Sequence, residues 1–232
     1  DSSVVGANDG TIVGATGTGT TLNLDGTDDY VEIDSLYGKP SNATLAAWVN
    51  LTTVGTAGSE VISIGNSLIL RLDMSYQSKG LNGAFYNGSD WVDISDGTFL
   101  EGQGWHHVAY SFDDTNDTHT LYLDGIAVST ASTTQSISYA TSNNAKTTVT
   151  TTLGINSLSA DLDFNGQIDD ARVYDRVLTV EEIALLASDS NLQDTDTVAI
   201  TVNSVNDAPT ATNNTVTTNE DTAYTFTAAN FN

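Results

Sequence analysis

The chain has 232 residues, of which 30 are acidic and only six are Lys or Arg, so its formal net charge is −24. Such a charge repels polyanions, which excludes nucleic-acid binding and attachment to anionic membranes, and no apolar run is long enough for insertion into a bilayer. The chain contains no cysteine, which excludes disulfides, thiolate metal sites and a cysteine nucleophile.

Short segments that alternate between apolar and polar residues follow one another along most of the chain. Clusters of Gly, Asn and Asp separate them, and the spacing leaves no room for helical crossovers, so the pattern predicts antiparallel strands. We therefore expect an all-β fold in which two sheets pack face to face as a sandwich. The predicted strands are residues 11–14, 20–25, 29–33, 43–50, 60–65, 67–73, 81–86, 91–94, 105–112, 119–124, 126–130, 147–155 and 166–174.

Four of these segments carry distinctive motifs. They are residues 24–33 (LDGTDDYVEI), 105–109 (WHHVA), 121–125 (LYLDG) and 164–174 (FNGQIDDARVY). In this order and spacing they resemble the laminin-G-like (concanavalin A-like) jelly-roll domains, and the resemblance extends over residues 1–188. It implies a jelly-roll sandwich that ends in a short helix and commonly binds Ca²⁺.

The first motif contains a cluster of aspartates. Asp25 and Asp28 flank its turn, and the resemblance places the strand that carries Asp170 beside the early strands. Three neighbouring carboxylates repel one another unless a cation lies among them. We therefore expect a structural Ca²⁺ held by Asp25, Asp28 and Asp170. The alternative is an Asp–Arg network that uses Arg172 or Arg176.

A second polar cluster is expected at one rim of the sandwich. The turn at residues 66–67 and the loop at residues 87–90 should emerge at the same end, and the resemblance adds the loop at residues 156–163. Exposed Ca²⁺ can exchange water for vicinal hydroxyls, and an aromatic ring can stack on a sugar. The alternative makes Trp91 a core residue and the polar residues ordinary turn formers. The candidate metal or glycan residues are Asn87, Asp90, Asn156, Asp161 and Asp163, and the candidate stacking residues are Trp91 and Tyr86.

Other chemistries fit the sequence poorly. Residues 161–169 (DLDFNGQID) match the start of an EF-hand loop, but position twelve is Arg172 instead of Glu. His106 and His107 are adjacent on a strand and point to opposite faces, so they cannot chelate one metal together. Glucanases of this architecture pair Glu and Asp at alternate positions of one strand, and the six glutamates of this chain lack that pattern. We therefore do not expect an enzyme, and a glycan hydrolase is the least favoured alternative.

One helix is predicted after the last of these strands. Thr179 and Glu182 have the spacing of a capping box, in which each side chain accepts from the backbone N–H of the other residue. Ile183, Leu185 and Leu186 then give the helix an apolar side. We interpret this helix as a structural plug of the jelly roll.

The character of the sequence changes after this helix. Residues 198–202 alternate as a strand, and residues 205–209 (VNDAP) and 219–226 (NEDTAYTF) resemble the junction between cadherin-like repeats of bacterial repeats-in-toxin adhesins. We expect residues 189–232 to form this extended β tail and linker, distinct from the domain at residues 1–188. The resemblance implies Ca²⁺ at the linker. The candidate ligands are Asp194, Asp196, Asn206, Asp207, Glu220 and Asp221.

Together these features predict a secreted, calcium-dependent carbohydrate-binding domain that is displayed at the bacterial cell surface within a long adhesin. We expect a monomer that lies beside neighbouring domains of the same adhesin. Its partners would be cell-surface or algal glycans, for example those with fucose-like or mannose-like ends. The alternative is a structural or protein-binding spacer, in which Ca²⁺ serves only rigidity.

Overall fold

The structure is a computed structural model, and it divides the chain into two compact units, Asp1–Gln193 and Asp194–Asn232. Among the described residues, no helix is both long enough and apolar enough to cross a membrane. The residues that the structure describes are 10–18, 21–55, 57–74, 79–140, 150–155, 162–188 and 215–231.

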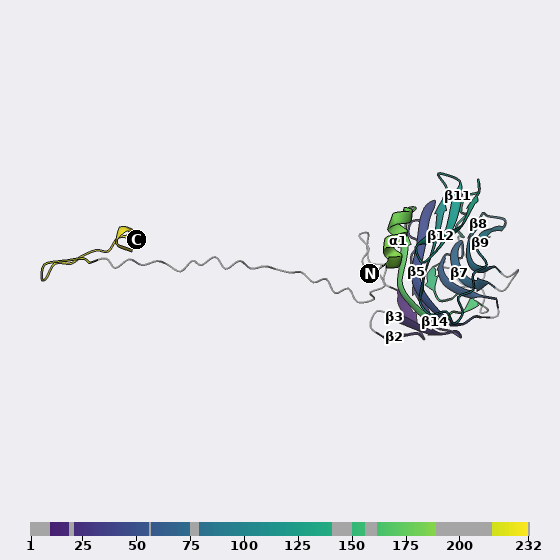
Figure 1. The fold of residues 1–232 in the computed structure, drawn as a ribbon, viewed down its shortest axis with the longest axis horizontal. Coiled ribbons are helices and arrows are strands. Elements are labelled where there is room, and N and C mark those ends of the chain that lie inside the picture. Colours follow the sequence, from purple (N-terminus) through teal and green to yellow (C-terminus); the bar gives the residue numbers. More distant parts are fainter. Residues whose placement is uncertain are drawn as a thin grey trace. The chain divides into compact units, whose positions relative to one another are not determined.

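The first unit is a sandwich of two seven-stranded antiparallel sheets (Figure 1), which confirms the predicted all-β jelly-roll class. The first sheet contains, in spatial order, β1 (Thr11–Val13), β4 (Tyr30–Ile33), β13 (Thr151–Leu153), β6 (Ser59–Ile64), β7 (Leu68–Met74), β8 (Gly80–Tyr86) and β9 (Trp91–Ser95). The second sheet contains β12 (Ile126–Ser132), β11 (Thr118–Leu123), β10 (His106–Asp113), β5 (Asn42–Thr53), β14 (Asn165–Tyr174), β3 (Thr21–Asp25) and β2 (Thr16–Thr18).

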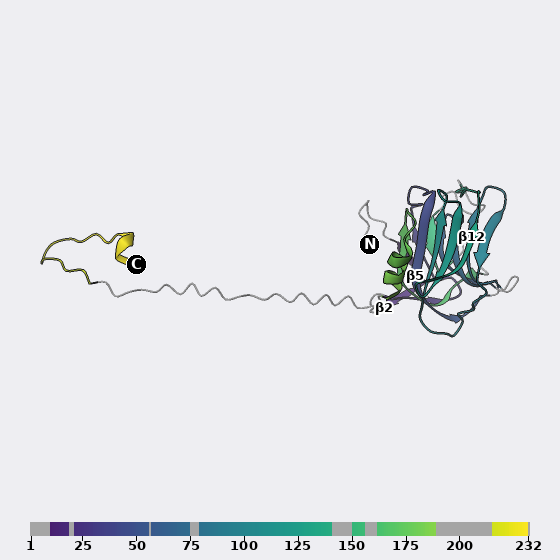
Figure 2. The ribbon, with the colours of Figure 1, turned by 45° about the horizontal axis from the view of Figure 1, so that its top comes forward.

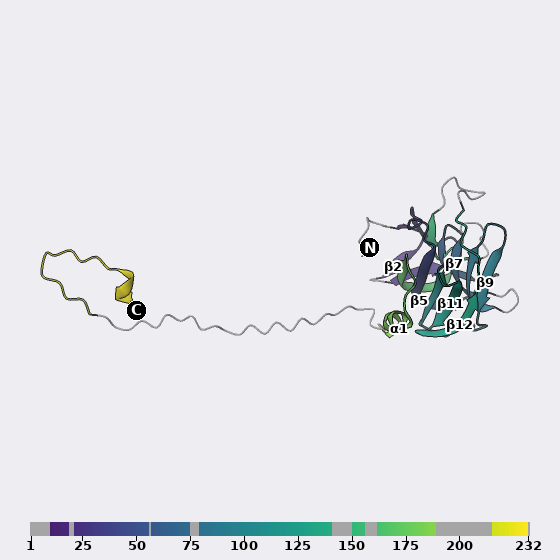
Figure 3. The same ribbon diagram turned by 90° about the horizontal axis from the view of Figure 1, so that it is seen from above.

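Each strand predicted within the described residues is present, with shifts at its ends. β2 was not predicted, because Thr16-Gly17-Thr18 contains no apolar residue that would mark a buried face. The edge strands β9 and β12 of the two sheets contact each other at one side of the sandwich (Figure 3). The strand predicted at residues 198–202 lies outside the described residues.

The apolar core lies between the two sheets. Leu68, Leu70 and Leu72 alternate along β7, and all three are fully buried in the central cluster. From the second sheet, the Tyr110 ring reaches β8 at Gly83, where a Cβ atom would lie 2.3 Å from the ring. The absence of a side chain at Gly83 therefore lets the two sheets approach closely at this point.

Helix α1 (Val180–Ser188) covers the outer face of the second sheet and runs beside β5 (Figure 2). The predicted capping box is confirmed: the Glu182 N–H donates to Thr179 Oγ1 at 3.2 Å, and the Thr179 N–H donates to Glu182 Oε2 at 2.8 Å. Ile183 is fully buried against outer-face side chains of β5, β10 and β11. The Trp48 indole of β5 donates to the carbonyl oxygen of Leu186 at 3.4 Å. The helix is thus fixed to the sheet by apolar contacts and by one polar contact.

The second unit is described over residues 215–231. It contains a turn, in which the Thr222 N–H donates to the Asn219 carbonyl oxygen at 3.2 Å, and the 3-10 helix η3 (Ala228–Phe231). Tyr224 and Phe226 are exposed and contact each other edge to face, with ring centroids 5.3 Å apart.

Candidate functional site

The loops of the sandwich lie at its two ends. We call one of them the Asn87 end. It contains the turn at residues 65–67, the loop at residues 87–90 and the segment at residues 135–140. Backbone hydrogen bonds join these three: the Tyr86 N–H donates to the Ser67 carbonyl oxygen at 2.8 Å, and the Ser138 N–H donates to the Tyr86 carbonyl oxygen at 2.7 Å. The prediction that the turn at 66–67 and the loop at 87–90 share one end is confirmed.

The opposite end, which we call the Asp25 end, contains the turn at residues 25–29. Asn165, the first residue of β14, pairs there with Asp25 and with Thr53, and its side-chain amide donates to the Asp25 carbonyl oxygen at 2.8 Å. Leu153 at the end of β13 pairs with β4, close behind this turn. The chain therefore leaves β13 at the Asp25 end.

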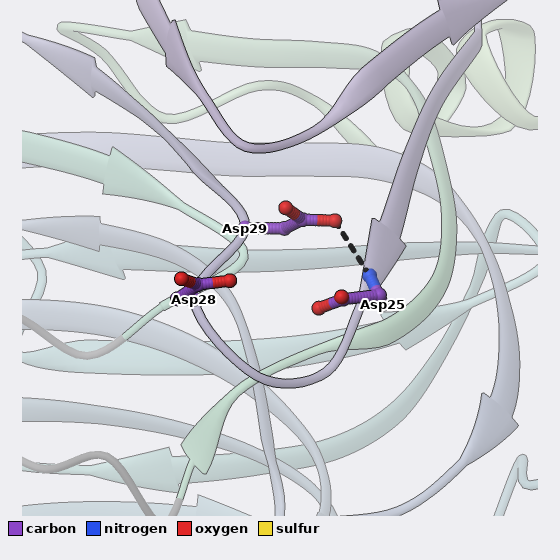
Figure 4. A group of neighbouring side chains, drawn as sticks. All are labelled: Asp25, Asp28 and Asp29. Carbon is purple, nitrogen blue, oxygen red and sulfur yellow. Dashed lines mark hydrogen bonds between the residues drawn. The ribbon is translucent and has the colours of Figure 1, made fainter.

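Three carboxylates converge in the turn at the Asp25 end. Asp25, Asp28 and Asp29 each offer an oxygen, and these oxygens lie within 4.8 Å of one another (Figure 4). The Asp25 N–H donates to Asp29 Oδ2 at 2.9 Å, and the Thr27 N–H donates to Asp25 Oδ1 at 2.9 Å, so backbone bonds hold two of the carboxylates in place. Ca²⁺ binds oxygens at about 2.3–2.6 Å, so two of its ligands lie up to about 5 Å apart. The spacing of the three carboxylates therefore fits one Ca²⁺.

The prediction of Asp170 as a ligand at this turn is wrong. Asn165 pairs with Asp25, and Asp170 lies five residues further along β14, which corresponds to about 16 Å along a strand. Its carboxylate instead accepts from Arg172 Nε at 2.7 Å, as the alternative Asp–Arg interpretation expected. Asp29, which was not predicted, is the third carboxylate of the cluster, because the turn between β3 and β4 folds back on itself.

The predicted rim site is not assembled as expected, because those of its residues that the structure describes are divided between the two ends. Asp163 is buried at the Asp25 end, where the N–H of the next residue, Phe164, donates to the Gly154 carbonyl oxygen at 2.9 Å. The physical reason is that β13 runs antiparallel to β6, so it ends opposite the turn that follows β6. The placement of Asp163 on the rim with Asn87 is therefore wrong. Asn156 and Asp161 lie outside the described residues.

Asn87 closes its own loop. Its Oδ1 accepts from the backbone N–H groups of Ser89 at 2.8 Å and Asp90 at 2.7 Å, and its amide donates to Gln135. These bonds leave the Asn87 oxygen poorly placed to bind a metal, whereas the Asp90 side chain is exposed. Between this loop and the segment at 135–138 lies an open depression of about 430 Å³. Its lining residues are Asn87, Ser89, Gln135, Ser136, Ile137 and Ser138.

Trp91 opens β9 directly after this loop and lies on the surface, 41% exposed. Its ring centroid lies 5.7 Å from that of Tyr86, and the Arg71 guanidinium lies 5.8 Å from the same indole centroid, within cation–π distance. The alternative that made Trp91 a core residue is therefore wrong. Its role in stacking on a sugar stays a prediction.

Charged residues extend from Trp91 across the outer face of β7, β8 and β9. Arg71 is paired with Glu60, which is fully buried. Lys79 Nζ lies 2.6 Å from Asp93 Oδ2, and the same oxygen accepts from the amide of Asn82 at 3.1 Å. Alternation along β7 and β9 predicts that Arg71, Trp91 and Asp93 point outward, but it does not predict that they form one cluster. We call this cluster the Trp91 face, and it consists of Arg71, Lys79, Asn82, Trp91 and Asp93.

The histidines occupy separate environments. His106 Nδ1 lies 2.9 Å from Asp124 Oδ2, whereas His107 is buried beneath α1. His119 is buried in the core, where its Nδ1 lies 3.0 Å from the Tyr110 hydroxyl, and burial lowers its pKa. The three side chains thus take part in three different sets of contacts.

The predicted linker ligands lie in the second unit. Glu220 and Asp221 are exposed within the turn at residues 219–222, and Asp221 has a left-handed backbone with φ of 64°. Asp194, Asp196, Asn206 and Asp207 lie outside the described residues.

Comparisons with known proteins agree with this architecture. Residues 25–184 match the family model of the concanavalin A-like lectin/glucanases superfamily. No curated protein is detectably similar in sequence.

Three solved structures are similar in fold. Domain 4 of AbnA, an extracellular arabinanase from Geobacillus stearothermophilus in complex with arabinotriose, is 19% identical with a TM-score of 0.57, covering 77% of this chain and 82% of that one. The binding domain of Paraclostridial Mosquitocidal Protein 1 is 13% identical with a TM-score of 0.55, covering 77% and 45%. The Ruminococcus gnavus IT-sialidase CBM40 bound to α2,3-sialyllactose is 16% identical with a TM-score of 0.50, covering 64% and 83%. This chain thus spans less than half of the second relative.

Proposed function

The chain belongs to the concanavalin A-like lectin/glucanases superfamily, and from this premise we propose that it is a carbohydrate-binding module that holds glycans without cleaving them. The observation that carries the proposal is the exposed indole of Trp91 beside the loop of the Asn87 end. Sugars offer apolar C–H faces that can stack on an exposed indole of this kind.

The surroundings of Trp91 suit a binding platform. Tyr86 and Arg71 pack against the indole and restrict its motion, so that little side-chain entropy is lost on binding. The depression next to the loop offers the side chains of Ser89, Ser136 and Ser138, whose hydroxyls can donate to and accept from sugar hydroxyls. A platform of this kind binds one sugar weakly, and several copies on one cell would raise the avidity.

The similar structures support this class of ligand. The arabinanase domain was solved with arabinotriose and the sialidase module with sialyllactose. Both share the sandwich at low identity, so the likeness itself concerns the fold. For this chain we propose a glycan ligand, and fucose-like and mannose-like ends stay the candidates.

Binding without reaction is also favoured by the environment of the glutamates. Retaining and inverting hydrolases need two carboxylic groups that face each other across the scissile bond. Glu60 is buried in its pair with Arg71, and Glu182 is paired with Arg176 and caps α1. These two side chains are thus engaged in structural contacts.

For calcium we propose the turn of Asp25, Asp28 and Asp29. Because this turn lies at the end opposite Trp91, the ion would stiffen the sandwich and would not touch the sugar. For the tail we propose that residues 189–232 form a cadherin-like junction in a secreted bacterial adhesin of the repeats-in-toxin type. In that setting the domain would act as a monomer and attach the cell to host or algal glycans.

A second candidate function is that of a structural or protein-binding spacer. The observation that favours it is the position of the exposed carboxylate cluster of the Asp25 end, away from the Trp91 face. In this case Ca²⁺ would rigidify the domain, and no sugar would bind.

The deciding experiment is a glycan array probed with the full chain and with Trp91→Ala. We expect specific glycans to bind, and Trp91→Ala to weaken this binding at least tenfold, or about 1.4 kcal/mol, because the stacking surface is lost. Phe99→Ala is a matched control: Phe99 is also an exposed aromatic, at 46%, but it lies in the loop that follows β9, away from the Asn87 end. An empty array with folded protein would favour the spacer, and equal loss in both variants would contradict the assignment of Trp91.

A further inference from the structure

The Trp91 face carries a balanced set of charges. Arg71 is paired with Glu60, and Lys79 with Asp93. The two cations and two carboxylates sum to zero, and Asp90 adds a negative charge at the edge of the face. The region around the exposed indole therefore presents no net positive charge to a ligand.

Both cations are also held close to their partners. The Arg71 side chain is only 12% exposed and its partner Glu60 is fully buried. The Lys79 side chain is 20% exposed, and the Asp93 carboxylate that binds it also accepts from Asn82. A ligand carboxylate or sulfate that approached either cation would have to displace a carboxylate that is already in place, or lie next to it. Separating Arg71 from the buried Glu60 is costly, and a ligand anion that lies next to either carboxylate is repelled by it.

The rest of the molecule adds to this effect. The chain carries a net charge of −24, and two further cations, Arg172 and Arg176, are paired with Asp170 and Glu182. Such a field disfavours anionic ligands at long range, and salt screens it beyond about 8 Å at 0.15 M. The neutral hydroxyl and amide groups of the depression are unaffected by this field and can bind sugar hydroxyls.

From this arrangement we infer that the site selects neutral sugars and rejects glycans that carry a carboxylate or a sulfate. The inference rests on the proposed function and narrows it to a chemical class of ligand. The preference for neutral over anionic glycans would arise from the charge pairs of the Trp91 face as well as from the overall charge of the chain.

The test compares a neutral oligosaccharide that the chain binds with the same oligosaccharide after addition of a sialic acid or a sulfate. At 0.05 M NaCl we expect the full chain to bind the neutral form at least tenfold more tightly, and we expect the ratio to shrink at 0.5 M NaCl. An anionic form that binds equally well or better, with an affinity that falls as salt rises, would overturn the inference and leave the proposed function standing. If neither form nor any other glycan binds, the proposed function fails and this inference fails with it.

Asp93→Asn separates local pairing from overall charge. It removes the negative charge that lies 2.6 Å from Lys79 Nζ, so we expect the ratio of anionic to neutral affinity to rise at least fivefold. Glu182→Gln is the matched control, because it changes the net charge by the same amount and releases Arg176 on α1, away from the Trp91 face; its ratio should not change. Equal ratios in the two variants would show that charge pairing at the site has no role.

Discussion

At the scale of single residues, His107 shows how burial controls a charge. It is 2% exposed beneath α1, and its ring lies edge-on to Trp48 with centroids 5.7 Å apart. Within the described residues, its Nδ1 has no hydrogen-bond partner. Burial lowers the pKa of His107 to about 4, although Asp170 and Asp124 oppose the shift, while Arg172 adds to it. The folded protein therefore keeps this imidazole neutral.

This shift predicts a loss of stability in acid. The folded-state pKa of His107 lies below the unfolded value of about 6.5, so the unfolded chain binds the proton first as the pH falls. The stability that depends on a neutral His107 is therefore complete above pH 6.5 and is lost as the pH falls toward 4. The full difference corresponds to at most about 3 kcal/mol. We expect urea unfolding between pH 7 and pH 4 to show this loss in the parent chain but not in His107→Phe, which keeps a ring against Trp48. Carboxylates titrate in both proteins, so the difference between them isolates His107. Parallel pH profiles would contradict the prediction.

At the scale of elements, α1 depends on contacts at both of its ends. At its start, the Glu182 carboxylate accepts from both terminal nitrogens of Arg176 and from the Thr179 N–H, each at 2.8 Å. The Arg176 guanidinium and this backbone bond lower the pKa of Glu182 to about 2. Near its end, the Leu186 carbonyl oxygen accepts from the Trp48 indole. Leu185 remains 69% exposed, so only part of the predicted apolar side is buried. A helix of this length is marginal alone, and its packing on the sheet stabilises it.

Removal of the cap should therefore be measurable. We expect Thr179→Ala to lower the free energy of unfolding by about 1 kcal/mol, because the Glu182 N–H loses its acceptor. Urea unfolding followed by tryptophan fluorescence is a suitable measurement, since Trp48 lies under the helix. Glu181→Gln, at a neighbouring exposed position of the same turn, is the control and should change stability by less than about 0.5 kcal/mol. Equal effects in both variants would mean that the capping box is unimportant.

At the scale of the whole molecule, the excess of acid opposes compactness. A net charge of −24 on 232 residues destabilises the folded state by self-repulsion. In the turn of Asp25, Asp28 and Asp29, oxygens of three of these charged groups lie within 4.8 Å of one another. A divalent cation there would relieve the repulsion and join the end of β3 to the start of β4.

Calcium should accordingly raise the melting temperature. A concentration one hundredfold above Kd would add about 2.7 kcal/mol of stability. We expect the increase on adding Ca²⁺, measured by calorimetry, to be absent in Asp28→Asn and present in Asp117→Asn. Asp117 is an exposed aspartate in the hairpin between β10 and β11.

The position of the turn makes a second outcome testable. Because Trp91 lies at the opposite end, a chelator should lower the melting temperature but leave glycan binding intact while the protein remains folded. Loss of glycan binding by the folded, chelated protein would instead mean that the ion contacts the sugar.

The sequence by itself determined the features that depend on near neighbours. Alternation fixed the strands and hence the sandwich, the spacing of Thr179 and Glu182 fixed the start of the helix, and the turn after Leu24 identified Asp25 and Asp28 as neighbours. Each of these follows from distances of a few residues along the chain, where local geometry dictates what lies beside what.

Only the tertiary structure decided which distant residues meet. It kept Asp170 away from the turn at residues 25–29, placed Asp163 at the Asp25 end, and brought Arg71 against an exposed Trp91. Alternation tells which face of a strand a side chain occupies, but register, strand direction and order determine its end of the sandwich and its partners. Register, direction and order are set by packing between segments far apart in sequence. For example, β13 follows β12 in the chain but lies antiparallel to β6 in the other sheet.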